Sequence, residues 1–588
     1  MADSIMRLTE EQKNAIEEEG NISLVACPGS GKTRTLISKA ARCIRDVFGT
    51  PRKIACITYT NSAANEVRSR LSLKGISHVD DYCDVSTIHA FCLNNVLRYF
   101  YWMIPHYHDG YMVLPPDSDD FKEIANSLIR EYSLDRRHAP GQFELMNREI
   151  DGEPIVGWPL IPEVALQFWD ILQEQGYIDF PNIVYWSFKL LRDNPYISNA
   201  LASKYAWILI DEFQDTTSLQ VEIFSDLLTY GKTNYFIVGD PNQSIYRFAG
   251  ARVELFEVFE NKIGAVRHYL TGNWRSGPAI IADADKLLPR ENPMRAVGKF
   301  RDSNTKTSYY HSDSVFSGII DHFIPALDEY SISYGNSAIL APWWIPLLHL
   351  GRALREYGVP IVGPGARPYK RIHLIAPLIE ECGAFLADST ITRIPNIERE
   401  LYFLLNNIND QSSSRIFSYD GRKVVYEILR ASSKLQDQCQ SSGKVWLTEM
   451  GTILPRILHK HGFLGESDYE AFAESSEQIL EDMSRNDVDI ENISVEELGL
   501  FARPNDSVRL LTMHKAKGLE FEAVALIDLH NGRLPHFSAK TNEDREDSRR
   551  LFYVAITRAE RLLMYFTDQS DWRNHPTPFL CSEGLELA

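Results

Sequence analysis

A glycine-rich loop near the N-terminus constrains the fold of this chain more than any other feature. An apolar run at 22–25 predicts a strand before the loop, and a periodic segment at 32–43 predicts a helix after it. The loop reads Ala26-Cys27-Pro28-Gly29-Ser30-Gly31-Lys32-Thr33. Backbone N–H groups of such a turn, and of the helix after it, point at a bound phosphate. The loop therefore predicts a nucleotide site, in which Lys32 contacts the outer phosphates and Thr33 holds Mg²⁺. An ordinary glycine-rich turn is the competing interpretation, and Ala26 in place of glycine loosens the match slightly.

The composition is that of a globular protein. The 588 residues are 44% hydrophobic and 24% charged, which is enough for several large cores. No apolar run is long enough to cross a bilayer, and the segment from Met1 to Gln12 lacks the apolar centre of a signal peptide. The eight cysteines include no C-x-x-C pair, which favours reduced thiols over a zinc or iron–sulfur site. We therefore expect a cytoplasmic protein with no membrane partner.

The net charge of −19 argues against a nucleic-acid partner, because phosphate contacts favour basic surfaces. A local basic groove inside an acidic shell is still compatible with that charge. The candidates for such a groove are Arg68, Arg70, Arg98, Arg509, Lys515 and Lys517. For most of them taken singly, a solvated surface charge is the preferred interpretation.

Short apolar runs alternate with helical segments in two parts of the chain. The runs lie at 53–58, 207–210 and 235–238 in the first part, and at 508–512, 523–527 and 562–566 in the second. Such alternation is typical of parallel sheets covered by helices. The segments at about 99–176 and 372–498 are mainly helical in pattern. We therefore expect an α/β fold with two parallel-sheet cores, each carrying a mainly helical insertion.

Two adjacent acids follow the apolar run at 207–210. Asp211 and Glu212 are thereby predicted at the carboxyl end of a strand, where ligands bind in open α/β sheets. Asp211 suits a Mg²⁺ partner, and Glu212 suits the orientation and deprotonation of an attacking water. A polar strand end that caps a helix is the competing interpretation.

A third polar segment, at 238–251, also follows a predicted strand. Gln243 can bond a γ-phosphate or the water that attacks it, and Tyr246 and Phe248 offer flat faces just beyond. Aromatic faces beside a phosphate sensor would let a motor respond to a base and a nucleotide together. Both rings are equally well explained as core residues.

Two arginines, Arg275 and Arg558, are candidates for neutralising the charge that builds on a transferred phosphoryl group. If both belong to the second core, they reach the nucleotide only when the two cores close, which would couple hydrolysis to domain motion. Two surface ion pairs are the plainer interpretation.

These segments, in this order, resemble the motifs of superfamily 1A DNA helicases of the UvrD/Rep/PcrA type. The matching segments are Leu8-Thr9-Glu10-Glu11-Gln12, the phosphate loop with Arg34, Thr58-Tyr59-Thr60-Asn61, Thr87-Ile88-His89, the segments around Asp211 and Gln243, Asn273-Trp274-Arg275-Ser276, the run 512–521 and the segment around Arg558. One such motif is weak support, whereas the ordered set is specific.

The resemblance implies two RecA-like motor domains with helical insertions. The first, 1A, would comprise 1–98 and 177–277, with insertion 1B at 99–176. The second, 2A, would comprise 278–371 and 499–588, with insertion 2B at 372–498. The family implies ATP hydrolysis between the two domains, with Mg²⁺, and movement 3′ to 5′ along single-stranded DNA with separation of duplex ahead.

The resemblance also implies roles for particular residues. The catalytic group would be Lys32, Asp211, Glu212, Gln243, Arg275 and Arg558. ATP would contact Gln12, Ala26, Cys27, Pro28, Gly29, Ser30, Gly31, Lys32, Thr33, Arg34 and Glu520, and the metal would contact Thr33 and Asp211. Single-stranded or tailed duplex DNA would contact Tyr59, Thr60, Asn61, Thr87, His89, Tyr246, Phe248, Trp274 and His514.

The chain departs from the family pattern in ways that support an alternative. The family's Trp-Arg-Gly is replaced by Phe248-Ala249-Gly250, with an arginine earlier, at Arg247. The 2B-like segment is also short. The alternative is a regulatory ATPase that senses DNA or nucleotide and controls a separate nuclease subunit, as in bacterial antiphage systems. A different phosphate-loop protein is disfavoured, because the chain has no Asn-Lys-x-Asp guanine signature and no Leu-Ser-Gly-Gly-Gln transporter signature.

Overall fold

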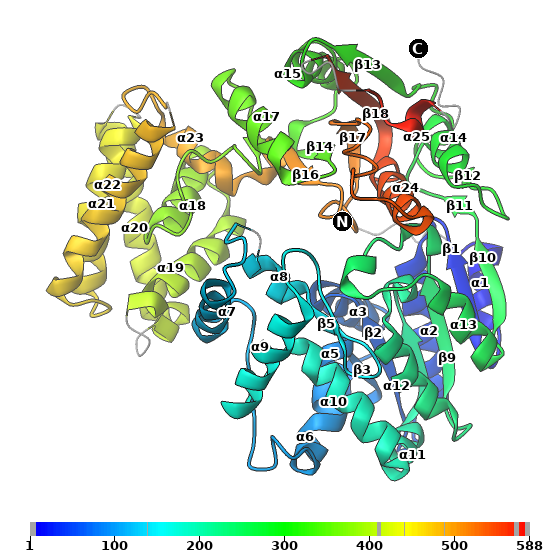
Figure 1. The fold of residues 1–588 in the computed structure, drawn as a ribbon. Coiled ribbons are helices and arrows are strands. Elements are labelled where there is room, and N and C mark those ends of the chain that lie inside the picture. Colours follow the sequence, from blue (N-terminus) through cyan, green and yellow to red (C-terminus); the bar gives the residue numbers. More distant parts are fainter. Residues whose placement is uncertain are drawn as a thin grey trace. The chain divides into compact units, whose positions relative to one another are not determined.

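The structure is a computed structural model that describes residues 8–137, 139–408, 413–439, 442–486, 488–569 and 575–581. Contacts divide the chain into two compact units. Unit 1 comprises Met1–Asn304 and Lys540–Thr557, and unit 2 comprises Thr305–Ala539 and Arg558–Ala588. Each unit is built around a parallel sheet and is described by itself (Figure 1).

Unit 1 is organised by a six-stranded sheet in the order β10-β1-β9-β8-β2-β3. Its strands are β1 (Ile22–Ala26), β2 (Lys53–Thr58), β3 (Cys83–Thr87), β8 (Tyr205–Ile210), β9 (Asn234–Gly239) and β10 (Val266–Leu270). Every neighbouring pair is parallel. The carboxyl ends of all six strands therefore meet at one edge of the sheet, which is where the predicted site segments begin.

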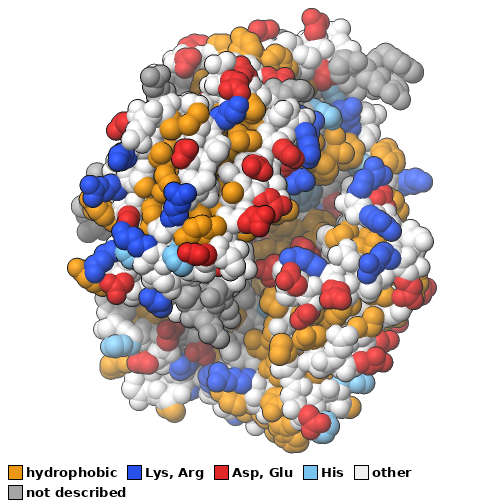
Figure 2. Space-filling view, turned by 90° about the vertical axis from the view of Figure 1, so that its left-hand side faces the viewer, with side chains coloured by type: hydrophobic (Ala, Val, Ile, Leu, Met, Phe, Trp, Pro, Cys, Tyr) orange, Lys and Arg blue, Asp and Glu red, His pale blue; other side chains and the backbone are white. Residues whose placement is uncertain are grey.

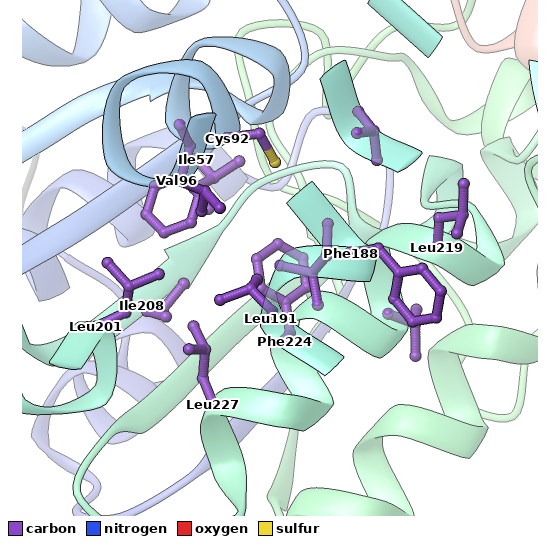
Figure 3. Close-up of a cluster of buried hydrophobic side chains, with 14 of the residues drawn as sticks. Ile57, Cys92, Val96, Phe188, Leu191, Leu201, Ile208, Leu219, Phe224 and Leu227 are labelled. Carbon is purple, nitrogen blue, oxygen red and sulfur yellow. The ribbon is translucent and has the colours of Figure 1, made fainter. Parts of the chain in front are cut away.

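Helices cover both faces of this sheet, because its side chains alternate between two cores. Ile208 and Ile210 of β8 face one core, whereas Trp207 and Leu209 face the other. The first core, part of which Figure 3 shows, is covered mainly by one set of helices, and the second mainly by another. The first set is α5 (Ile88–Cys92), α10 (Phe180–Asp193), α11 (Pro195–Lys204), α12 (Ser218–Leu228) and α13 (Glu254–Ile263), and the second is α1 (Glu10–Glu17), α2 (Lys32–Val47) and α3 (Asn61–Leu73).

A smaller helical cluster interrupts unit 1 between β3 and β8. It consists of α7 (Asp119–Glu131), α8 (Ala139–Leu145) and α9 (Pro162–Glu174), which pack around Phe121, Phe143, Phe168 and Trp169. Short strand pairs flank the cluster: β4 (Met112–Val113) with β7 (Tyr177–Ile178), and β5 (Asn147–Arg148) with β6 (Pro154–Ile155). The segment is helical because its apolar residues recur on one face of each helix.

The remaining elements of unit 1 are short or lie after its sheet. They are α4 (Val79–Tyr82), α6 (Arg98–Phe100), the strand pair β11 (Gly272–Asn273) and β12 (Arg295–Ala296), α14 (Pro278–Leu287), and α24 (Asn542–Ile556). The last helix is distant in sequence yet belongs to unit 1, where it packs against α14 and the turn Pro241–Gln243.

Unit 2 repeats the architecture with a second six-stranded parallel sheet, in the order β13-β18-β17-β14-β16-β15. Its strands are β13 (Ser308–Ser312), β14 (Ser337–Ala341), β15 (Ile361–Val362), β16 (Val508–Thr512), β17 (Phe521–Leu526) and β18 (Ala559–Asp568). Its remaining short helices are α15 (Val315–Gly318), α16 (Ile324–Glu329), α17 (Trp344–Glu356) and α25 (Pro578–Cys581).

A helical cluster separates β15 from β16 in unit 2. Its helices are α18 (Ala376–Ala387), α19 (Ile394–Ile408), α20 (Tyr419–Gln438), α21 (Gly443–Lys460), α22 (Tyr469–Arg485) and α23 (Val495–Gly499). They enclose a core of their own, in which Trp446, Met450 and Phe472 are fully buried. The predicted α/β class with two parallel-sheet cores is thereby confirmed.

The surface bears on the possible partners. Within the described ranges, no helix combines the length and the apolar character needed to cross a bilayer. On the face drawn in Figure 2, acidic and basic side chains are interspersed with hydrophobic ones.

Replacement of a side chain between the sheet and its helices should destabilise unit 1. Ile208 is fully buried in the core that Figure 3 shows, so Ile208→Ala should cost about 2–5 kcal/mol in the free energy of unfolding. Val258 on α13 is 53% exposed, and Val258→Ala should change stability by no more than about 0.5 kcal/mol. Urea unfolding followed by intrinsic fluorescence measures both, and equal losses would contradict the burial described here.

Candidate nucleotide site and adjoining aromatic surface

Four neighbouring strands of unit 1 deliver the predicted site segments to one edge of its sheet. In sheet order these strands are β1, β9, β8 and β2, and the residues that follow them are Cys27, Asp240, Asp211 and Tyr59. Because the strands are parallel and in direct contact, segments separated by up to about 200 positions in the sequence lie side by side. The phosphate loop, the carboxylate pair and an exposed ring are therefore adjacent.

The backbone of the phosphate loop takes a conformation that its glycines make possible. Gly29 and Gly31 have φ angles of 66° and 83°, in the left-handed region that other residues rarely adopt. A Cβ atom at Gly29 would lie 2.6 Å from the Cβ of Arg275, and one at Gly31 would lie 2.8 Å from Nε2 of Gln12. Conformation therefore favours glycine at both positions, and at Gly29 the space is also too small for a side chain.

The other predicted loop residues complete this cradle. Ala26 ends β1, Cys27 is buried, and Pro28 leads into the turn. The Ser30 hydroxyl donates to the Cys27 carbonyl at 2.7 Å, which closes the loop on itself. Lys32, Thr33 and Arg34 form the first turn of α2, whose N-terminal N–H groups have no partner within the helix.

The predicted adenine-side residue Gln12 lies against the same loop. Its side-chain amide donates to the Ser30 carbonyl at 3.1 Å, and its side-chain oxygen accepts from the Thr9 N–H at 3.1 Å. Thr9 in turn caps α1 by accepting from the Gln12 N–H. The capping box fixes Gln12 beside the phosphate loop.

The carboxylate pair is held next to the loop lysine. Nζ of Lys32 lies 3.2 Å from Oε2 of Glu212, and the Glu212 N–H donates to Oδ1 of Asp211 at 3.0 Å. Burial and the neighbouring charge of Glu212 raise the pKa of Asp211 well above its ordinary value. For Lys32, burial lowers the pKa, but the carboxylates of Glu212, Asp240 and Asp211 outweigh it, so the pKa is raised. The site is thus rich in negative charge and is suited to a cation.

Glu212 is also held in an uncommon backbone conformation. Its φ angle is 52°, in the left-handed region, which costs of order 1–3 kcal/mol for a residue other than glycine. The conformation turns the chain sharply after β8, and the carboxylate then accepts from Nε2 of Gln214 at 2.5 Å. Strain of this kind concentrates at functional sites, which fits the predicted role of Glu212.

Gln214 is a site residue that the sequence patterns did not identify. It is fully buried and joins two of the predicted segments. Its amide nitrogen donates to Glu212, and its side-chain oxygen accepts from the Asp240 N–H at 3.0 Å. Its carbonyl also accepts from the Ser244 hydroxyl at 2.9 Å. In the sequence, only its position next to Asp211 and Glu212 points to the site, because its other partners, Asp240 and Ser244, follow a different strand.

Asp240 forms a second buried connection that the patterns missed. It accepts from Nε2 of Gln243 at 2.6 Å, and both of its carboxylate oxygens lie 2.6 Å from Nη2 of Arg290. Arg290 also donates to the hydroxyl of Tyr553 on α24, at 2.5 Å from Nη2 and 3.1 Å from Nε. Burial would lower the pKa of Arg290, but the charge of Asp240 outweighs it and raises that pKa. The predicted phosphate sensor Gln243 is therefore oriented by an ion pair.

Arg275 lies in unit 1 rather than in the second core. The N–H of Trp274 donates to the Gly29 carbonyl at 2.9 Å, which places the segment on the phosphate loop. The side-chain oxygen of Asn273 accepts from the Arg275 N–H at 2.8 Å, and Nη1 of Arg275 donates to the Thr557 carbonyl at 3.1 Å. The conditional expectation that both arginines lie in the second core therefore fails for Arg275.

Three of the predicted base-contacting rings lie together beyond the carboxylates. Tyr59 and Tyr246 are stacked, with ring centroids 5.3 Å apart and an interplanar angle of 10°. Phe248 meets Tyr246 edge-on at 6.0 Å and is 44% exposed. We name Tyr59, Tyr246 and Phe248 the aromatic group. The backbone of Trp274, by contrast, is bonded to the phosphate loop, and its contact with DNA stays a prediction.

Thr60 and Thr87 lie at helix starts beside the aromatic group. The Thr60 hydroxyl accepts from the Ala63 N–H and caps α3, and the Thr87 hydroxyl accepts from the Ala90 N–H and caps α5. Both hydroxyls thus have a structural role as caps, which the motif-based assignment did not anticipate. The N-terminus of α3 also presents exposed Asn61 at its first position.

His89 follows Thr87 on α5. Its ring contacts Phe180 at 5.4 Å. Burial lowers the pKa of His89 to about 4, so its imidazole is neutral near pH 7. Any contact that it makes with a polymer is therefore a hydrogen bond or a ring contact and not an ion pair.

The remaining predicted residues lie in unit 2. His514 follows β16, and burial lowers its pKa to about 4. Glu520 precedes β17 and is exposed. Arg558 is buried, and its guanidinium donates to the Leu519 carbonyl at 3.1 Å, next to Glu520 in the chain. Unit 2 therefore brings Arg558 close to the segment of Glu520.

Comparison with known proteins gives two family matches. The profile of the UvrD/REP helicase N-terminal domain matches residues 8–264, and that of the UvrD-like helicase C-terminal domain matches residues 466–569. Together they cover more than half of the chain. The matched ranges include all the predicted site residues except Trp274 and Arg275, which fall between them.

Curated relatives span nearly the whole chain. The ATP-dependent DNA helicase PcrA of Staphylococcus epidermidis is 25% identical over 96% of this chain and 83% of its own length. PcrA of Staphylococcus aureus is 25% identical over 94% and 82% of the two chains. A probable DNA helicase II homolog of Mycoplasma capricolum is 24% identical over 95% and 84%.

An added methyl group in the phosphate loop should weaken nucleotide binding. Gly29→Ala should reduce the affinity for a fluorescent ATP analogue at least about tenfold, which is about 1.4 kcal/mol, because its Cβ would collide with Asn273 and Arg275. Gly20→Ala is the matched control: its φ angle is 75°, but a Cβ there meets open space. An unchanged affinity in Gly29→Ala, measured beside a normal control, would contradict the described cradle.

Proposed function

The chain belongs to the UvrD/Rep family of superfamily 1 DNA helicases, and from this premise we propose that it is an ATP-driven motor that moves 3′ to 5′ on single-stranded DNA and separates duplex ahead of it. One observation carries the proposal. The phosphate loop, the carboxylate pair and the aromatic group adjoin along a single sheet edge of unit 1. A conformational change at the nucleotide site would therefore reach, within a few residues, aromatic rings that can stack on DNA bases.

The residues present fit a Mg²⁺–ATP complex. The glycine cradle and the N-terminal turn of α2 suit phosphates, and the adjacent carboxylates of buried Asp211 and partly exposed Glu212 suit a divalent cation. Thr33 and Asp211 would hold the metal, and Gln12 and Arg34 would contact the base side of the nucleotide. When bound, Mg²⁺ would offset the charge of the β- and γ-phosphates.

The side chains around this site have complementary parts in hydrolysis. Lys32 would bind the outer phosphate oxygens, in place of its present contact with Glu212. Glu212 would then accept the proton of the attacking water, which Gln243 orients from its bond to Asp240. Arg275 of unit 1 and Arg558 of unit 2 would stabilise the charge that develops on the transferred group. Glu520 would contact the ribose.

The aromatic group would hold the DNA strand mainly by stacking. Each stacked base is worth about 1–3 kcal/mol, and stacking is indifferent to base identity. Thr60, Asn61 and Thr87 would bond the backbone, whereas His89 and His514, neutral at pH 7, would add no charge. Such a strand contact suits a motor in a protein with a net charge of −19. The same proposal places the protein in the cytoplasm, with its DNA.

The alternative, a regulatory ATPase that controls a separate nuclease subunit, rests on the departures from the family pattern at 247–250 and in the short 2B-like segment, and the comparisons do not favour it. The relatives named above are all described as helicases. The separate nuclease, and with it a role in antiphage defence, is therefore not part of the proposed function. Unwinding by the isolated chain separates the two possibilities.

The first test addresses the water-activating carboxylate. Glu212→Gln should bind ATP normally but lower turnover by about 10²–10⁴-fold, since an amide cannot accept the proton. Lys32→Ala should instead lose binding. Glu257→Gln, on the exposed face of α13, is the control and should behave as the parent does. Steady-state ATPase and equilibrium binding distinguish these outcomes, and parental turnover in Glu212→Gln would refute its role.

The second test addresses the polarity of the motor. The purified chain should hydrolyse ATP faster when single-stranded DNA is added, and it should unwind a duplex with a 3′ single-stranded tail but not one with a 5′ tail. A strand-displacement assay with both substrates, and with the Lys32→Ala variant as the inactive control, gives the answer. Preference for the 5′ tail would overturn the direction, and stimulation without unwinding of either substrate would favour the regulatory alternative.

A further inference from the structure

Arg247, a sequence neighbour of two members of the aromatic group, is bound by three acids on α24. Arg247 lies between Tyr246 and Phe248 in the sequence. Its guanidinium lies 2.6 Å from a carboxylate oxygen of Glu543, 3.0 Å from one of Asp547 and 3.3 Å from one of Asp544. All three acids lie in the first two turns of α24, and both sides of this cluster belong to unit 1.

The acids are themselves fixed, so the cluster has a defined geometry. Asp544 takes part in a capping box with Thr541, in which each accepts from the other's N–H at 3.1 Å. Asp547 is also bound by Arg550 at 3.0 Å. An isolated surface ion pair is worth only about 0–1 kcal/mol, but one cation shared by three ordered carboxylates also relieves their mutual repulsion. We name Arg247, Glu543, Asp544 and Asp547 the acidic latch.

Two other arginines hold α24 further along its length. Arg290, paired with Asp240, donates to Tyr553, and Arg275 donates to the Thr557 carbonyl just after the helix. The helix of 15 residues is about 22 Å long at 1.5 Å per residue. Its start is therefore bound to Arg247, the neighbour of Tyr246 and Phe248 in the sequence, and its end to Arg290, the partner of Asp240, and to Arg275, which lies beside Gly29. The next residue in the chain is Arg558.

We propose that α24 is the coupling rod of the motor, and that Arg247 is the positioning residue that joins it to the aromatic group. The inference deepens the proposed function and rests on it. When bases stack on Tyr246 and Phe248, the backbone between them moves with the rings, and the acidic latch transmits that movement to α24. A stiff helix carries the movement to Tyr553 and Thr557, and thus to Arg290, Arg275 and the attachment of Arg558. DNA occupancy would in this way set the arrangement of the catalytic arginines.

A neutral substitution tests the latch. Arg247→Gln should leave basal ATPase within about twofold of the parent and the KM for ATP unchanged, but should lower the DNA-stimulated kcat about five- to tenfold, within the usual range of coupling between sites. Arg252→Gln is the matched control, because Arg252 lies on the same segment, is similarly exposed, and pairs with Glu149 instead of α24. The control should retain full stimulation.

A charge reversal separates the latch from a general loss of structure. Arg247→Glu should abolish stimulation, and its combination with Glu543→Arg and Asp547→Arg should restore at least half of it. Hydrogen exchange should also be faster at amides 543–547 in Arg247→Gln, without DNA or nucleotide. Parental stimulation in Arg247→Gln, failure of the reversal to rescue, or unchanged exchange would overturn the coupling rod. Absence of DNA stimulation in the parent would instead overturn the proposed function.

Discussion

The buried ion pair between Asp240 and Arg290 is the contact on which the rest of the site depends. Asp240 is fully buried, and Arg290 nearly so. Removal of one partner from such a pair leaves an uncompensated charge, which typically costs about 3–5 kcal/mol. The pair orients Gln243 on one side and Tyr553 on the other. A carboxylate directly after a strand of the sheet thereby connects the phosphate sensor to a helix some 300 residues further along the chain.

A second connection, through Gln214, joins the segment of Glu212 to the segment of Asp240 by hydrogen bonds. Gln214 can accept and donate at once, and it uses both abilities between Glu212 and Asp240. The strained φ angle of Glu212 persists because these contacts outweigh its cost. The Glu212 carboxylate is thus held in place without a bound nucleotide, and such preorganisation would suit the catalytic role that we propose for it.

The sequence predicted those parts of the fold and site that local patterns determine. The strand, glycine turn and helix of the phosphate loop are contiguous in the sequence. Asp211 and Glu212, at the end of β8, are contiguous in the same way. The parallel arrangement then brings such strand ends together without further information. Arg290 and Tyr553 could not be found, because their roles come from packing between distant segments. The backbone bond between Trp274 and Gly29 likewise joins segments that are distant in the sequence, and no local pattern predicted it.

In the proposed motor, arginine side chains and aromatic rings would have different parts. Three arginines of unit 1, Arg247, Arg275 and Arg290, each bond to α24 or to the residue that ends it. The aromatic group, by contrast, would meet a DNA strand with uncharged faces. A contact made by stacking varies little with ionic strength, whereas ion pairs to phosphate weaken steeply in salt. A motor must also release the strand at every step, so moderate stacking energies favour movement over tight binding. In the proposed motor the three arginines would join the aromatic group and the nucleotide site to α24, and the rings would hold the polymer.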